Sequence, residues 1–330
     1  MERRTAIQLI ATAGAVIPLA DLEQSLTTMD RILDTRIDLD DWERTVREYG
    51  YQFVRRPVGA LAADLTAEIT AVSHLLNQGN APRVQAGLLR VAAELSSLLA
   101  TDLHDSGRPR VARHVWRAAR RSADASGDQE LSVYVRAKEA DDLWWAGSSP
   151  HAVRELAEQA VIRAGDTPSY GILRAHIVRC RLAADGHGGD IGEARAALRA
   201  FSETFERLPP GGHGRPEDAL GEAWLHWHEA HLLTMIGDDQ AQDVFDQALA
   251  RYSADTPGTV SLLQLIRALD LVRRREIDDG LTHAVTTLST GPLSTARRFI
   301  TTEITKALPR QAHTHPHATE LRRLISFHGL

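Results

Sequence analysis

Apolar side chains recur every three or four residues along most of the chain from about residue 57 onward. This is the spacing of a helix that buries one face. The alternation of apolar and polar positions that is typical of strands is rare, Ala and Leu are abundant, and aromatic residues make up only 5% of the chain. The pattern therefore predicts an all-α protein.

Short breaks rich in Gly, Ser, Asp and Pro separate the predicted helices. The glycines in the turns between paired helices are Gly107, Gly147, Gly186 and Gly237, which lie 40, 39 and 51 residues apart. A period near 40 with two helices per unit predicts a helical-repeat array, because each hairpin has two apolar faces and can bury both only by stacking on its neighbours. We expect five to six helical hairpins within residues 81–330 and an irregular helical N-terminal cap over residues 1–80.

Three segments, 86–128, 129–166 and 168–208, resemble degenerate tetratricopeptide repeats (TPR). Each is an Ala- and Leu-rich helix, a glycine turn, a second helix with small residues and a turn containing Gly, Pro or Asp. The spacings exceed the usual repeat length, and not all consensus aromatic positions are kept. The resemblance implies a TPR-like superhelix in which the first helix of each hairpin lines a concave groove.

The formal net charge is −6, so no global positive field attracts nucleic acid, although a local basic patch remains compatible with it. The lone cysteine, Cys180, excludes an internal disulfide and a cysteine-rich metal site. Residues 1–20 admit two interpretations, an amphipathic first helix or a twin-arginine export signal, and the short, interrupted apolar run favours the helix. No apolar run is long enough to span a membrane, and we expect a cytoplasmic protein.

An arginine stripe is predicted on the helix that begins near residue 108. At 100° per residue its members fall within an arc of about 100°, opposite the apolar positions. Arginine presents a planar fork to phosphate and carboxylate groups, so the stripe is a candidate anion-binding site. The alternative is the solvated outer face of a second repeat helix. The five residues are Arg110, Arg113, Arg117, Arg120 and Arg121.

A predicted groove combines aromatic, imidazole and charged side chains on first helices. One helix carries Trp224, Trp227, His228 and His231 on one side, where they form a ligand-pocket wall, a structural core or part of a metal site. The helix one hairpin earlier carries Arg174. The helix before that carries Tyr134, Lys138, Asp141 and Trp145 on one face, where the alternative to a groove is pairing within the helix, Lys138 with Asp141.

The whole chain resembles the C-terminal sensor region of Xre-type (lambda-repressor-like) bacterial transcription regulators. Three segments carry the resemblance: ERRTAIQLIATAGA at 2–15, DLDDWERTVREYGYQF at 38–53 and ATELRRLISFHGL at 318–330, together with the TPR-like array. The resemblance implies a role in transcription control. It also implies a DNA-binding helix-turn-helix domain that has no counterpart in this sequence, so we expect no direct sequence-specific DNA binding from these residues.

Recognisable enzyme motifs are missing from the sequence: it has no GxSxG, no GxxxxGK[ST] and no GxGxxG after a strand. We therefore expect a binding protein without catalytic residues, cofactor or metal. The predicted function is a regulatory module that senses a small molecule or peptide in its groove and acts on a partner protein, such as a DNA-binding regulator, or through a homodimer. The alternatives are a constitutive protein scaffold and an enzyme that uses the Trp/His face around His228.

Overall fold

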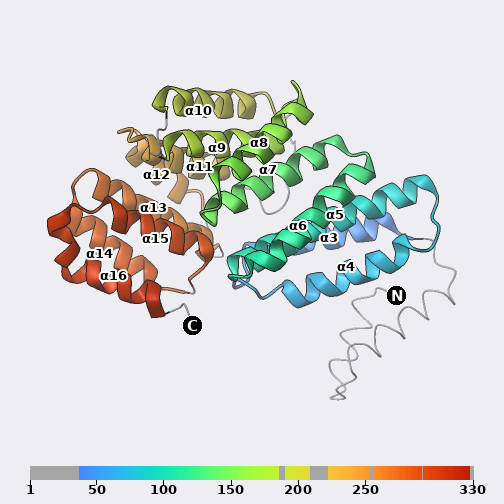
Figure 1. Ribbon diagram of the computed structural model, residues 1–330, viewed down its shortest axis with the longest axis horizontal. Helices are drawn as coiled ribbons and strands as arrows, with labels where there is room; N and C mark the ends of the chain where they lie inside the picture. Colours follow the sequence, from blue (N-terminus) through green and yellow to red (C-terminus); the bar gives the residue numbers. More distant parts are fainter. Residues whose placement is uncertain (1–36, 186–189, 209–221, 253–255, 292, 328–330) are drawn as a thin grey trace, which may run out of the picture. The chain divides into compact units, whose positions relative to one another are not determined.

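The computed structural model describes residues 37–185, 190–208, 222–252, 256–291 and 293–327. Within these ranges it contains fourteen α-helices, one short 3-10 helix and no strand (Figure 1), which confirms the all-α prediction. The segment 2–15 and the first 36 residues of the predicted cap lie outside the described residues. None of the helices in the described ranges is long and apolar enough to cross a membrane.

The chain divides into two compact units, Met1–Asp41 and Trp42–Leu330. The predicted boundary at residues 80–81 falls between α4 and α5, within the second unit. The helices of the described chain are α3 (Leu39–Phe53), α4 (Ala62–Leu76), α5 (Pro82–Asp105), α6 (Pro109–Ser126), α7 (Gln129–Trp145), α8 (Pro150–Ala164), α9 (Tyr170–Ala184), α10 (Ile191–Glu206), α11 (Glu222–Ile236), α12 (Ala241–Leu249), α13 (Pro257–Arg273), α14 (Ile277–Leu288), α15 (Thr295–Ala307), η1 (Arg310–Thr314) and α16 (Pro316–Phe327).

Successive helices in the second unit form packed pairs. Helix α5 packs on α6, α7 on α8, α9 on α10, α11 on α12 and α13 on α14. The first helices also pack on one another in sequence order, α5 on α7, α7 on α9, α9 on α11 and α11 on α13. The structure thus has the paired, neighbour-to-neighbour packing that the period near 40 predicts.

Glycine ends several of the first helices as the turn pattern predicts. Gly107, Gly147 and Gly237 have φ values of 77°, 63° and 71°, in the left-handed region that only glycine enters without a steric cost. The fourth predicted turn glycine, Gly186, lies outside the described residues. A left-handed residue lets the chain reverse within two or three residues, and each reversal starts the second helix of a pair.

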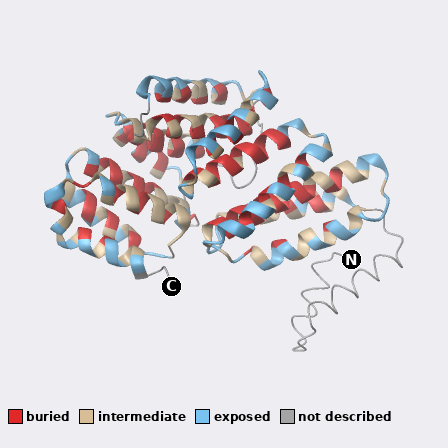
Figure 2. Ribbon diagram, in the orientation of Figure 1, coloured by how far each residue is buried: buried red, intermediate tan, exposed pale blue. Residues whose placement is uncertain are grey.

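First and second helices differ in how much of their surface they bury (Figure 2). Helix α7 buries residues on all sides, including Leu131, Tyr134, Asp141 and Trp144. Helix α6 buries a single stripe, Ala112, Trp116, Ala119 and Ala123, and leaves its other residues exposed or half-buried. A helix that is buried all round belongs to an inner layer, and an amphipathic one covers it.

Helix α15 returns to the start of the array. It packs on α13 and also touches α5 and α7. The hydroxyl of Thr295 donates to the backbone carbonyl of His104 over 2.8 Å, and the Phe299 ring lies 4.6 Å from that of Trp144, between centroids. The inner helices therefore close around the space between them, where the sequence pattern predicts an open groove.

Candidate functional site

A cavity of about 210 Å³ lies among the inner helices. Every first helix from α5 to α15 contributes to its wall, and residues that follow α12 and the end of α3 complete it. Because the cavity is built from six helices that are distant in sequence, its shape depends on the whole second unit.

Eight of the nine predicted groove residues line this cavity. The ninth, His231, is fully buried behind the wall and does not line it. The structure thus brings together side chains from three first helices, α7, α9 and α11, which the helical pattern places on matching faces. The eight are Tyr134, Lys138, Asp141, Trp145, Arg174, Trp224, Trp227 and His228.

Asp141 pairs with two arginines from α9, of which Arg174 lines the cavity and Arg181 lies behind the wall. Arg174 donates through Nη1 to Asp141 Oδ2 over 2.7 Å, and Arg181 donates through Nη1 to Asp141 Oδ1. Burial alone would raise the pKa of Asp141, but the charges of Arg181 and Arg174 outweigh it and hold that pKa below its usual value. Since all three side chains are buried, removal of the carboxylate would leave two uncompensated charges in the core.

Arg181, which is completely buried, lies between aromatic rings and two histidines. Its guanidinium carbon is 4.7 Å from the ring centroid of Trp144 and 4.7 Å from that of Trp145, within the range of a cation–π interaction. Its Nη2 lies 3.4 Å from His228 Nδ1 and 3.2 Å from His231 Nδ1. A guanidinium only donates, so both Nδ1 atoms accept and the ring protons sit on Nε2.

The two histidines are neutral as a result. Burial, and next the charge of Arg181, lower the pKa of both His228 and His231 well below the usual value. Both Nδ1 atoms face the Arg181 guanidinium. This cation occupies the position that a metal ion bound by both Nδ1 atoms would need. Among the residues that the structure describes, no group of three or more His, Cys, Asp and Glu side chains is arranged to hold a metal ion.

Carboxylates gather at the α5 side of the cavity. Lys138 Nζ lies 3.3 Å from Asp142 Oδ1, so within the helix the lysine pairs with Asp142, where the sequence suggested Asp141. Asp142 Oδ2 is buried and has no hydrogen-bond partner within the described ranges. Burial, followed by the charge of Asp142, raises the pKa of Asp105 to about 7.

Aromatic rings form the opposite wall. The Trp227 indole N–H donates to the backbone carbonyl of Thr259 over 3.3 Å, and the Trp224 ring packs edge-on against His228 with 4.3 Å between centroids. The Arg174 guanidinium lies 5.8 Å from the Tyr134 ring centroid and 5.6 Å from that of Trp224. These contacts hold the rings in place, so the cavity wall is preorganised.

Several wall residues escape the sequence analysis. Asp105 ends α5, Tyr252 follows α12, and Ala296 begins α15. Nothing local marks them, because they reach the cavity through the return of α15 and the packing of α5 on α7. Arg181, which does not line the cavity itself, shares the helical arc of Arg174 on α9, and the spacing in the sequence already places it there.

The arginine stripe lies apart from the cavity wall, on the outer face of α6. Arg110, Arg113, Arg117 and Arg121 are exposed. Arg120 is half-buried and pairs with Glu139 on α7, with 3.2 Å between Nη1 and Oε2. The structure therefore keeps four of the five predicted anion-site residues together on the surface and gives the fifth a partner within the fold.

Comparison of the sequence with protein-family models, with curated proteins and with solved structures gives no match. The resemblance to Xre-type regulators stays a prediction from the sequence.

Proposed function

We propose that the chain is a regulatory module that binds a small molecule in the cavity among its inner helices. The observation that carries the proposal is the convergence of eight aromatic and charged side chains from three helices on one cavity. A preformed pocket with apolar walls and a few polar groups is the usual form of a small-ligand site.

The cavity size favours a small molecule over a peptide. Its volume of about 210 Å³ lies below the range of roughly 300–1,000 Å³ that is typical of drug-sized ligands. The wall chemistry favours a compact ligand with a planar or apolar body, which the rings of Trp224 and Trp227 would contact. Polar groups of such a ligand would meet Asp142 and Lys138 at the other side.

Binding without catalysis is the favoured activity. The hydroxyls of Ser97 and Thr101, which line the cavity, donate to the carbonyls of Ala93 and Ser97 over 2.8 and 3.1 Å. Neither hydroxyl is thus paired with a base that would make it a nucleophile. His228 faces Arg181 through Nδ1, and the nearby positive charge opposes the protonation that a general base must undergo.

The closure of α15 supplies a route from ligand to partner. Ala296 lines the cavity, and the same helix carries Thr295 and Phe299, which contact α5 and α7. A ligand that contacts α5, α7 and α15 together stabilises the closed arrangement over an open one. In keeping with the resemblance to Xre-type regulators, we propose that a partner DNA-binding protein responds to that arrangement.

Native mass spectrometry of the purified full chain tests the proposal. We expect a mass excess that disappears on denaturation and corresponds to a small organic molecule. The identified compound is then titrated into apo protein. Trp227→Phe, which alters the cavity wall, should weaken binding at least tenfold. The control Trp116→Phe, on the buried face of α6, should change the affinity less than twofold.

Three outcomes would count against this function. If both tryptophan variants weaken binding equally, the ligand does not occupy the cavity. If the retained molecule is consumed and released as a different compound, the chain is an enzyme. If the native mass equals that of the chain alone, and no compound of a small-molecule library raises the melting temperature, a constitutive scaffold describes the protein better.

A further inference from the structure

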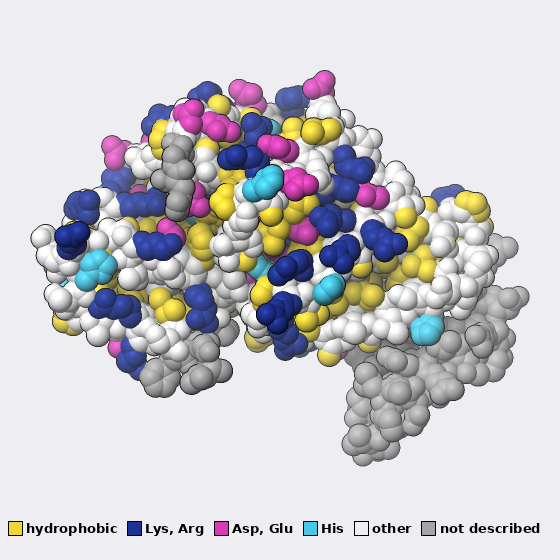
Figure 3. Space-filling model, viewed as in Figure 1, with side chains coloured by type: hydrophobic (Ala, Val, Ile, Leu, Met, Phe, Trp, Pro, Cys, Tyr) yellow, Lys and Arg dark blue, Asp and Glu magenta, His cyan; other side chains and the backbone are white. Residues whose placement is uncertain are grey.

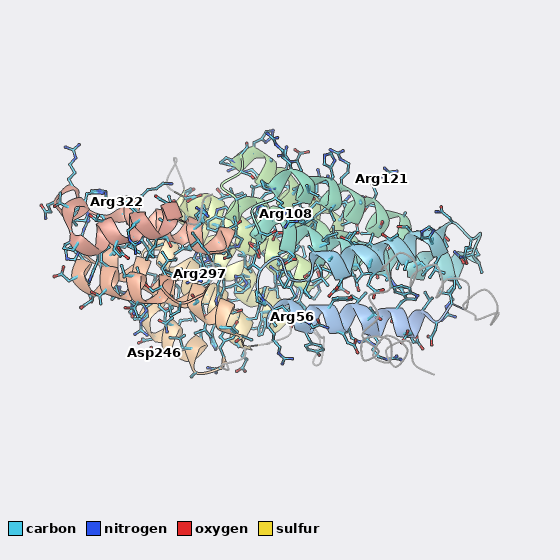
Figure 4. All side chains as sticks on the ribbon, turned by 90° about the horizontal axis from the view of Figure 1, so that it is seen from below. Arg56, Arg108, Arg121, Asp246, Arg297 and Arg322 are labelled. Atoms are coloured by element: carbon cyan, nitrogen blue, oxygen red, sulfur yellow. The ribbon has the colours of Figure 1, made fainter. Side chains whose placement is uncertain are left out.

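The outer face of α6 carries a concentration of positive charge. Arg110, Arg113, Arg117 and Arg121 are exposed there. They lie opposite the buried stripe with which α6 packs on α5 and α7. Dark-blue side chains gather over α6 in the space-filling view (Figure 3). Figure 4 labels Arg108, which precedes the first residue of the helix, and Arg121, which lies five residues before its last one.

None of these four arginines forms an ion pair with a carboxylate in the described part of the chain, although the charge of Arg117 acts on Glu139 from a longer distance. No carboxylate there lies within 4.0 Å of their nitrogens. Some exposed arginines near other second helices are paired: Arg195 on α10 lies 3.4 Å from Asp238, and Arg251, after α12, lies 3.3 Å from Glu222. Other exposed arginines, such as Arg154 on α8 and Arg199 on α10, also form no ion pair with a described carboxylate, so what distinguishes α6 is that four such arginines share one helix face.

This arrangement does not favour the stability of α6. Like charges three and four residues apart destabilise a helix by roughly 0.2–0.5 kcal/mol per pair. Positive charge in the first turn, where α6 has Arg110 and no acidic residue, also opposes the helix dipole. An acidic residue at any of these positions would relieve the repulsion, so the face is better explained by an external anion.

We propose that the exposed face of α6 binds the phosphate backbone of a nucleic acid without reading its sequence. The four guanidinium groups extend over 11 residues, or about 16 Å along the helix axis, and so reach several successive phosphates. Each guanidinium can donate two parallel hydrogen bonds to a phosphate. This surface lies outside the cavity wall, and the proposal does not depend on the function proposed for the cavity.

An acidic protein partner fits the face less well. Protein interfaces draw most of their binding energy from buried aromatic and apolar anchors. Val111, which is 51% exposed, is the one large exposed hydrophobic residue of α6. A purely ionic face matches a phosphate polymer, since sequence-independent binding to nucleic acid is almost entirely electrostatic.

The net charge of −6 does not prevent such binding. At 0.1 M ionic strength the screening length is about 10 Å, so the potential near α6 is set by these arginines more than by acidic residues on distant helices. The same screening makes salt the diagnostic variable, because each neutralised phosphate releases condensed counterions.

Fluorescence anisotropy with a labelled 20-base-pair duplex DNA tests the proposal. With four contacts we expect the logarithm of the association constant to fall against the logarithm of salt concentration with a slope of about −3.6. That slope corresponds to an affinity loss of about 10²-fold between 50 and 200 mM salt. A duplex of scrambled sequence should bind within threefold.

Two quadruple variants of equal charge locate the surface. Arg110→Gln, Arg113→Gln, Arg117→Gln and Arg121→Gln together should reduce binding at least tenfold at 50 mM salt and bring the slope close to zero. The control replaces four exposed arginines elsewhere and should retain at least half of the affinity, provided circular dichroism shows both variants folded. Its positions are Arg83, Arg154, Arg199 and Arg310.

The proposal is overturned if the wild-type chain shows no salt-dependent binding at 50 mM, or if both quadruple variants lose affinity equally. It is also overturned if polyglutamate of matched charge displaces the duplex as well as unlabelled DNA does, since the partner would then be an acidic polypeptide. A more than tenfold preference between sequences would show that bases are read and would contradict backbone recognition.

Discussion

Two aspartates at the cavity, the buried Asp141 and the half-buried Asp105, show how the neighbours of a carboxylate decide its ionisation. Asp141 faces Arg174 and Arg181, which hold its pKa low in spite of burial. The pKa of Asp105 is raised to about 7 by burial and by the nearby Asp142, with the charges of Asp102 and Asp141 adding to the effect and Lys138 opposing it. The same residue type is thus charged at one wall of the cavity and close to its titration point at the other.

The raised pKa of Asp105 predicts a loss of stability as the pH rises. Its usual pKa is 3.8 and its folded pKa about 7, so the unfolded chain loses the proton first, and the stability falls as the pH rises from about 4 to about 7 and stays reduced above that. Asp105→Asn removes this penalty. We expect the melting temperature of the variant to exceed that of wild type at pH 8 and the difference to shrink toward pH 5.

Differential scanning calorimetry of both proteins at pH 5 and pH 8 measures the effect. Glu158→Gln, at an exposed position on α8, serves as the control for loss of a surface carboxylate, and at pH 8 its melting temperature should exceed that of wild type by less than that of Asp105→Asn does. A difference between Asp105→Asn and wild type that is constant across this range would show that Asp105 is ionised throughout.

At the scale of elements, the spacing between helices α7 and α9 depends on one glycine. A Cβ atom at Gly171 would lie 2.7 Å from Val133 Cγ1 and 2.8 Å from the backbone nitrogen of Tyr134. Backbone atoms cannot move aside as a flexible side chain can, so a larger residue would separate the two helices. Tyr134 and Arg174 both line the cavity, and this close contact therefore helps to set its width.

Gly171→Ala is expected to destabilise the fold by about 1–3 kcal/mol, the usual cost of overpacking. Gly258 on α13 offers a matched control, because nothing lies within 4 Å of the Cβ it would gain. Gly258→Ala should be neutral or stabilise the helix by up to about 1 kcal/mol. Urea denaturation measures both, and equal free energies of unfolding for the two variants would contradict the tight α7–α9 contact.

At the scale of the whole second unit, α15 joins parts of the chain that are far apart in sequence. The hydrogen bond between Thr295 and His104 spans 191 residues. In a linear repeat array each unit contacts only its neighbours, and stability is close to a sum of local terms. Because α15 packs on α5 and α7 as well as α13, a change in the last helices should reach the first ones.

Phe299→Ala tests this coupling. The ring of Phe299 contacts those of Trp144 and Trp145, with centroids 4.6 and 5.9 Å apart, so its loss should loosen α15 from α7. We expect faster amide hydrogen exchange in α5 and α7, which lie more than 150 residues away in sequence. As a control, Phe245→Ala removes another buried ring, on α12, and its effect on exchange should stay within α11–α13.

If exchange in the Phe299→Ala variant becomes faster only in α13–α16, α15 does not couple the last helices to α5 and α7.

The hydrophobic pattern by itself determined that this chain is helical, where paired helices turn and which faces are buried. These properties depend on residues a few positions apart, since a helix repeats every 3.6 residues and glycine permits a left-handed turn wherever it stands. The same periodicity placed Tyr134, Arg174 and Trp227 on inward faces, and eight of the nine predicted groove residues line the cavity.

Only the tertiary structure decided how those residues are paired and which others join them. Asp141 pairs with Arg174 and Arg181, 33 and 40 residues away, and Lys138 pairs with Asp142. Ala296 reaches the wall through the return of α15, and Asp105 through the packing of α5 on α7. Periodicity records the direction of a side chain around its own helix axis, whereas partners depend on the distance between axes, which is set by packing across the whole unit.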